Sequence, residues 1–204
     1  MINGKILTKI EDGAKNLNIH LKNQSEWFVN PNVDEYNLDI LVENLGRANY
    51  GTSLMNTQRK GINSTILLDG NVCNEIHTYT FDFNQSFMNS TVHSKWNPIT
   101  TDDNNEKGPR LYRTQFQIES NPTDTFMKLP GWTYGNVFIN NFNIGRFDYR
   151  GPQKTLYIPG PLLRSGENVI HIFELDKRGS KIQLIDHPIW QQENIIFSQK
   201  FNKI

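Results

Sequence analysis

The chain has 204 residues and carries 21 lysines and arginines against 21 aspartates and glutamates, so its formal net charge is zero. A chain without net charge lacks the positive field of a nucleic-acid-binding protein, which excludes nucleic acid as an expected partner. The length is too short for a complete (β/α)₈ barrel, which typically needs about 250 residues. No apolar run approaches the roughly 18 residues of a membrane-spanning helix, so no membrane span is expected.

Alternation of apolar and polar residues predicts β-strands along the chain, whereas no segment shows an apolar stripe of helical period. The alternating segments are Leu38 to Val42, Tyr79 to Phe83, and Tyr112 to Ile118. A further segment, Val169 to Leu175, is apolar on both faces apart from His171 and Glu174, which is typical of a central strand between two layers.

Turn signals separate these segments at short intervals, as in an all-β sandwich. Asn140-Asn141 lies between two apolar runs and predicts a two-residue hairpin turn, in which both residues take a positive φ that Asn tolerates. The fold class predicted is therefore all-β, with two antiparallel β-sandwich domains.

One polar stretch, TTDDNNEKG at residues 100–108, lacks apolar anchors and divides the chain near its middle. We therefore expect a first β domain at 1–100, a linker or long loop at 101–108, and a second β domain at 109–204.

The sequence lacks the motifs that would indicate a catalytic site within this chain. There is no Gly-x-Ser-x-Gly elbow and no glycine-rich phosphate loop, and the five histidines lack zinc-ligand spacing, so no catalytic residue, metal or cofactor is expected. The single Cys73 cannot form an internal disulfide and is interpreted as a structural thiol. Glu43 and Glu174 lie in predicted strands, but nothing in the sequence brings them together as the carboxylate pair of a glycosidase.

Several blocks of sequence, in a shared order, closely resemble the C-terminal region of glycoside hydrolase family 35 β-galactosidases, especially the animal lysosomal type. The most informative block is residues 124–163, DTFMKLPGWTYGNVFINNFNIGRFDYRGPQKTLYIPGPLL. The other blocks are LDILVENLGRANYG at 38–51, KGI at 60–62, GPRLYRTQF at 108–116, GENVIHIFE at 166–174 and IDHP at 185–188.

The resemblance implies an intact enzyme with an N-terminal barrel, which carries two catalytic glutamates and the galactose pocket, followed by two β domains. Those domains have jelly-roll, galactose-binding-like folds. This chain resembles only these two β domains of the enzyme, and the resemblance implies that the first of them is incomplete at its start. We expect no signal peptide in this chain, and the resemblance implies that the parent enzyme is lysosomal or extracellular. We therefore expect no enzymatic activity from this chain on its own, and we expect the barrel of the parent enzyme as its partner.

The chain departs from the family pattern at two points that look exposed. Asn141 stands where relatives usually have Gly, and Phe147-Asp148 stands where they have a Tyr-Trp pair. Any sugar contact made by that aromatic pair is therefore in doubt here.

Four residues near predicted turns are candidates for carbohydrate binding, because aromatic faces and a bidentate donor can hold a sugar ring. An alternative remains open, in which Trp132 packs beneath the turns at Gly131 and Gly135, and Arg146 pairs with an acidic neighbour to hold the two β domains or the absent barrel. The segment GRANYG supplies candidates for an interdomain contact instead. The carbohydrate candidates are Trp132, Tyr134, Arg146 and Tyr149, and the interdomain candidates are Arg47, Asn49 and Tyr50.

Four Asn-x-Ser/Thr sequons are candidates for N-glycosylation and favour a secreted protein. They lie at Asn23, Asn63, Asn84 and Asn89. Three functions stay open at this stage: the non-catalytic region of a β-galactosidase, a free-standing lectin-like module that binds galactosides, and an incomplete gene product without activity.

Overall fold

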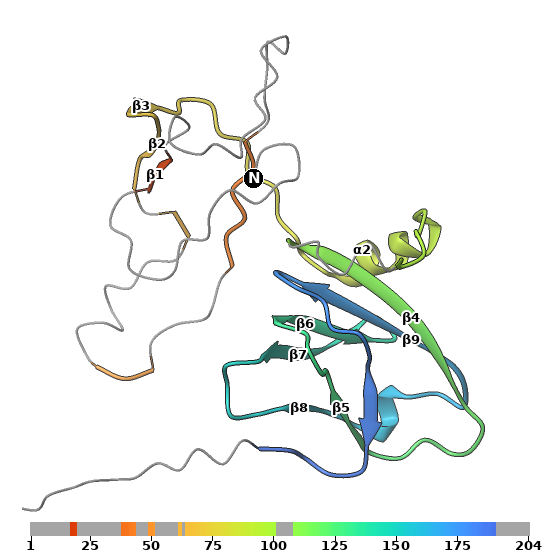
Figure 1. Cartoon of the computed structure of the whole chain (residues 1–204). Coiled ribbons are helices and arrows are strands. Elements are labelled where there is room, and N and C mark those ends of the chain that lie inside the picture. The colour runs from red at the N-terminus through yellow and green to blue at the C-terminus, as the bar shows by residue number, and fades with distance from the viewer. Residues whose placement is uncertain are drawn as a thin grey trace, which may run out of the picture. The chain divides into compact units, whose positions relative to one another are not determined.

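The computed structural model describes residues 17–19, 38–43, 49–51, 61–62, 64–100 and 108–190 (Figure 1). The chain divides into two compact units, residues 1–80 and residues 81–204. Most of the linker predicted at 101–108 lies outside the described residues, so the boundary drawn from composition stays a prediction. No helix in the described ranges is long and apolar enough to cross a membrane.

The first unit contains a three-stranded sheet in the order β1-β2-β3, formed by Leu17–Ile19, Ile66–Leu68 and Asn71–Val72. The hairpin between β2 and β3 turns at Asp69 and Gly70, whose φ angles of 48° and 81° both lie in the left-handed region. The pairing of β1 with β2 is parallel, which differs from the all-antiparallel pattern that was expected. The strand predicted at Leu38 to Val42 is wrong, because residues 39–43 form no regular element.

The second unit is a β-sandwich. Its larger sheet has the order β4-β9-β6-β7 and is antiparallel throughout. The strand predicted at Tyr112 to Ile118 is confirmed, and so is the central position predicted for Val169 to Leu175, which overlaps β9 between β4 and β6. Asn140 and Asn141 join β6 to β7 with φ angles of 49° and 71°, so the predicted hairpin turn is also confirmed. The strands are β4 (Arg110–Ile118), β9 (Gly166–Glu174), β6 (Tyr134–Ile139) and β7 (Phe142–Asp148).

The smaller sheet of the sandwich has the order β10-β5-β8, and its strands are Gln183–Ile185, Thr125–Lys128 and Thr155–Ile158. Alternate residues of both sheets point into a shared apolar core, and the short 3₁₀ helix η3 (Gly160–Leu162) follows β8. The buried core residues are Met127, Trp132, Val137, Ile139, Leu156, Ile158, Leu163, Ile170 and Ile172.

Residues 81–96, which we call the strap, contribute aromatic rings to the outer face of the larger sheet. The strap contains the helix α2 (Gln85–Ser90) and the 3₁₀ helix η1 (Thr91–His93), drawn in yellow-green in Figure 1. The strand predicted at Tyr79 to Phe83 is wrong, because Phe83 has a φ of 45° that interrupts an extended backbone. The Phe83 ring instead packs 5.1 Å from the ring of Phe138 and 5.0 Å from that of Phe173.

Candidate functional site

A pocket of about 830 Å³ lies in the second unit, between the turn after β5, the end of β7 with its following turn, and the segment after β9. This volume falls within the usual range for small-ligand sites, which is roughly 300–1,000 Å³. Trp132, Arg146 and Tyr149 all line the pocket, so the fold brings together three of the four carbohydrate candidates. Tyr134, the fourth, is not among the lining residues, and its ring packs against the guanidinium group of Arg146.

Trp132 is a core residue with only its edge at the pocket. The side chain is 7% exposed, and its Nε1 donates a hydrogen bond of 3.0 Å to the carbonyl oxygen of Lys181. Its ring meets Tyr112 edge-on at 5.2 Å, and Gly179 approaches so closely that an added Cβ would lie 2.4 Å from Trp132 Cδ1. The geometry therefore favours a packing role for this indole over a sugar-stacking role.

Arg146 pairs with an acidic neighbour in its own unit, which is one part of the alternative interpretation. Its Nη1 lies 3.0 Å from Asp148 Oδ2, and Arg150 reaches the same carboxylate with Nη2 at 2.8 Å and Nε at 3.0 Å. The hydrogen bonds from Arg150, supported by Arg146, lower the pKa of Asp148 to about 2. The Tyr134 ring lies against both guanidinium groups, with its centroid 5.8 Å from Arg146 and 5.6 Å from Arg150.

Asp148 and Arg150 were missed as site residues by sequence reasoning. A signal was present, because residues at i, i+2 and i+4 of an extended segment share one side. Arg-x-Asp-x-Arg over 146–150 is such a pattern of alternating charge. In the structure Arg146 and Asp148 line the pocket, and the guanidinium groups of Arg146 and Arg150 both lie against the Tyr134 ring.

Tyr149 presents an exposed aromatic ring at the pocket, with 58% of its surface accessible. Its backbone is fixed, since its N–H donates to the carbonyl of Thr133 at 2.8 Å and its own carbonyl accepts a hydrogen bond from Lys154 Nζ. An exposed ring on a fixed backbone is the arrangement needed to stack on a sugar face.

Glu174 is fully buried and organises the backbone at the edge of the pocket. Its carboxylate accepts hydrogen bonds from the N–H groups of Thr133 at 2.9 Å, Tyr134 at 3.3 Å and Asp176 at 2.8 Å. Burial raises its pKa, and these backbone donors oppose that rise. Since its oxygens are occupied by these donors, Glu174 is placed for a structural role.

The remaining sequence candidates lie outside the pocket. Asn49 and Tyr50 are exposed in the first unit, Tyr50 at 89%, and Arg47 lies outside the described residues. Of the sequons, Asn84 and Asn89 are exposed on the strap, while Asn23 and Asn63 lie outside the described residues. Cys73 is a half-buried free thiol, and no group of three metal-ligating side chains occurs among the residues that the structure describes.

Two packed antiparallel sheets with seven strands between them place the second unit in the class of β-sandwich domains. Residues 109–168 match the family model of the galactose-binding domain of β-galactosidase, and residues 10–82 match the model of the first all-β domain of β-galactosidase. The chain therefore belongs to the β-galactosidase family, in which it corresponds to these β domains.

Curated relatives agree with the family models. The chain is 40% identical over 153 residues to β-galactosidase-1-like protein 3 of Rattus norvegicus, covering 74% of this chain and 23% of that protein. It is 40% identical over 151 residues to β-galactosidase-1-like protein 2 of Homo sapiens, with the same coverages of 74% and 23%. β-Galactosidase 17 of Arabidopsis thaliana is 37% identical over 163 residues, again covering 74% and 23%. The chain thus spans about a quarter of the length of the curated relatives it matches.

Proposed function

We propose that this chain is the non-catalytic C-terminal β-sandwich region of a glycoside hydrolase family 35 β-galactosidase, which hydrolyses terminal β-linked galactose. Its role is to brace the catalytic barrel of that enzyme and to shape access to it. The observation that carries the proposal is the pair of family matches, which cover two β domains in order along a chain that spans 23% of its relatives.

The exposed residues of the first unit supply the proposed contact with the barrel. Tyr50 is 89% exposed, and exposed aromatic side chains are the type that most often anchors a protein interface. Arg47 and Asn49, its neighbours in the sequence, add hydrogen-bonding groups for the rim of such a contact. The parent enzyme is placed in the lysosome or outside the cell, where the sequons would carry glycans.

Fractionation of the native source tests this proposal. Peptides of this chain are followed by mass spectrometry through size-exclusion fractions, in parallel with hydrolysis of p-nitrophenyl β-galactoside. We expect the peptides and the activity to coincide in a species several times larger than 23.7 kDa. Peptides confined to a species of the size of this chain, without activity, would contradict the bracing role.

A second candidate function is a galactoside-binding module, which the pocket supports. The pocket of about 830 Å³ combines the exposed Tyr149 ring with hydrogen-bonding side chains such as Arg146 and Gln153. Titration of the purified chain with lactose and galactose, with glucose as the control, tests this function by calorimetry.

A matched pair of variants locates that binding. We expect Tyr149→Ala to weaken lactose binding at least fivefold, because the stacking face is lost. Tyr157→Ala serves as the control, since Tyr157 is also exposed, at 46%, but lies outside the pocket lining. Equal effects of the two substitutions, or no saturable binding at millimolar lactose, would argue against this second function.

A further inference from the structure

The pocket concentrates positive charge on a chain whose net charge is zero. Four cationic side chains line it, and Arg150 joins them through its bond to Asp148. Two carboxylates, those of Asp148 and Asp176, oppose these five cations. The cationic lining residues are Lys128, Arg146, Lys154 and Lys177.

The ion pairs within the pocket do not neutralise all of its positive charge. Asp148 is bonded by two arginines, so this carboxylate is occupied by Arg146 and Arg150 and does not pair with the lysines of the pocket. Lys154 donates to the carbonyl oxygen of Tyr149, a neutral group that leaves the ammonium charge uncompensated.

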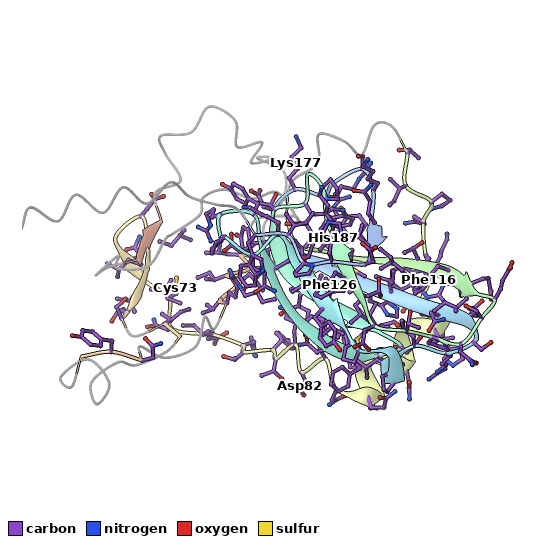
Figure 2. All side chains as sticks on the ribbon, turned by 90° about the horizontal axis from the view of Figure 1, so that it is seen from below. Cys73, Asp82, Phe116, Phe126, Lys177 and His187 are labelled. Carbon is purple, nitrogen blue, oxygen red and sulfur yellow. The ribbon has the colours of Figure 1, made fainter. Side chains whose placement is uncertain are left out.

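Two further ammonium groups remain for a ligand. Within the described part of the chain, neither Lys128 Nζ nor Lys177 Nζ has a hydrogen-bond or ion-pair partner. Figure 2 shows Lys177 extending outward from the surface of the second unit. A concave site with one excess sign of charge focuses its field, so it attracts ligands of the opposite sign.

We propose that this pocket binds an anionic galactoside, in which the sugar ring stacks on Tyr149 and a sulfate or carboxylate group on the saccharide is held by Lys128 and Lys177. This inference rests on the galactoside-binding function proposed above and adds the class of saccharide to it. Charge-assisted hydrogen bonds to an anion are roughly twice as strong as neutral ones, so an anionic saccharide gains over its neutral parent.

Calorimetric titration of the whole chain compares four probes: lactose, lactose sulfated on the galactose, sialylated lactose, and inorganic sulfate. We expect at least tenfold tighter binding of one or both anionic sugars than of lactose at low ionic strength, and a smaller difference at high salt. The two anionic sugars distinguish a sulfate from a carboxylate as the group recognised.

Substitution of the two lysines tests their role. The double variant Lys128→Gln/Lys177→Gln is expected to bring the affinity for the anionic sugar to within twofold of the affinity for lactose. Lys95→Gln/Lys181→Gln is the control, because both of these lysines are exposed in the second unit and neither lines the pocket. An equal loss in both double variants would overturn the assignment.

Other outcomes separate the two proposals. Equal affinity for neutral and anionic sugars would overturn the anionic specificity but leave galactoside binding intact, whereas no sugar binding at all would overturn both. If inorganic sulfate binds as tightly as the anionic sugar, the pocket is a general anion site and the saccharide assignment fails.

Discussion

His171 and Arg113 lie directly opposite one another in the antiparallel pairing of β4 with β9. The imidazole is 1% exposed, and its Nε2 lies 3.4 Å from Thr91 Oγ1 of the strap. The Trp96 ring packs at 5.9 Å, and the buried Nδ1 has no hydrogen-bond partner among the described residues. Burial, followed by the charge of Arg113, lowers the pKa of His171 from 6.5 to about 4. The folded unit therefore holds this histidine neutral.

Stability of the second unit should consequently fall as the pH is lowered from about 6.5 to 4. Below pH 6.5 an unfolded chain protonates this histidine, whereas the folded chain does so only near pH 4, so the unfolded state binds more protons in that window. The loss from this group is about 3 kcal/mol once both states are protonated. Hydrogen exchange of β9 peptides, followed by mass spectrometry across this pH range, measures the loss.

His171→Gln should flatten that pH dependence, because the titrating group is removed. His93→Gln is the matched control, because it replaces a histidine of the same unit that is exposed rather than buried. Glu174 acts in the opposite direction, because its raised pKa makes acidification relieve a buried charge. The comparison therefore uses the difference between wild type and variant; an undiminished slope in His171→Gln would contradict the assignment to this residue.

Gly135 allows β6 to approach β9 more closely than any other residue would. A Cβ added there would lie 1.8 Å from the carbonyl oxygen of Phe173, which is backbone of the neighbouring strand and cannot rotate away. We expect Gly135→Ala to destabilise the second unit by about 3 kcal/mol or more. Gly151→Ala should be nearly neutral, since its nearest contact is an ordinary 3.5 Å. Denaturant unfolding of both variants, read by tryptophan fluorescence, makes the comparison, and similar midpoints would refute the close approach.

Local pattern was sufficient for the sandwich but not for the strap. The alternation of Tyr112 to Ile118 and the Asn140-Asn141 pair each specify their structure within a few residues, and both predictions are confirmed. Phe81 and Phe83 show the same alternation, yet their rings stack at 6.0 Å and both reach Phe173, because Phe83 adopts a left-handed backbone. That conformation depends on packing against a sheet whose residues lie far along the chain. The periodicity of a short segment contains no information about such contacts.

The candidate site shows the same limit. Sequence reasoning grouped Trp132, Arg146 and Tyr149 because they cluster near turns, and the fold places all three at one pocket. It could not separate the buried Trp132 from the exposed Tyr149, because burial depends on the close approach of Gly179, which lies 47 residues after Trp132 in the printed sequence. The cationic lining from Lys128 and Lys177 likewise arises only when distant segments meet.

The two residues of the β6–β7 turn differ in what their side chains do. Asn140 Nδ2 donates to Leu162 O at 2.9 Å and to Asn168 Oδ1 at 2.8 Å, and its Oδ1 accepts from Val169 N at 3.0 Å. Asn141 makes one exposed contact, with Asn89 Oδ1 at 2.9 Å. Asn140→Gly should therefore cost roughly 2 kcal/mol, because it leaves the Val169 N–H and the Leu162 carbonyl oxygen without their side-chain partner.

Asn141→Gly, in contrast, should change the stability by less than about 1 kcal/mol, because glycine accepts the positive φ and only an exposed hydrogen bond is lost. Thermal unfolding of the two variants side by side provides the measurement. A larger loss at Asn141 than at Asn140 would show that backbone conformation, rather than the side-chain hydrogen bonds, dominates this turn.

The strap should be an integral part of the second unit. Met88 of α2 is fully buried, whereas Val92 of η1 is 59% exposed, so the two residues report on opposite sides of the same segment. Met88→Ala should destabilise the second unit by about 2–4 kcal/mol through the cavity it leaves, and Val92→Ala by less than about 0.5 kcal/mol. Hydrogen exchange is measured for peptides from β6 and β9, the strands that carry Phe138 and Phe173. Faster exchange of these peptides in Met88→Ala is the result expected if the strap is part of the unit. If Met88→Ala speeds exchange within the strap but leaves both strands unchanged, the strap opens independently and the larger sheet is stable without its cover.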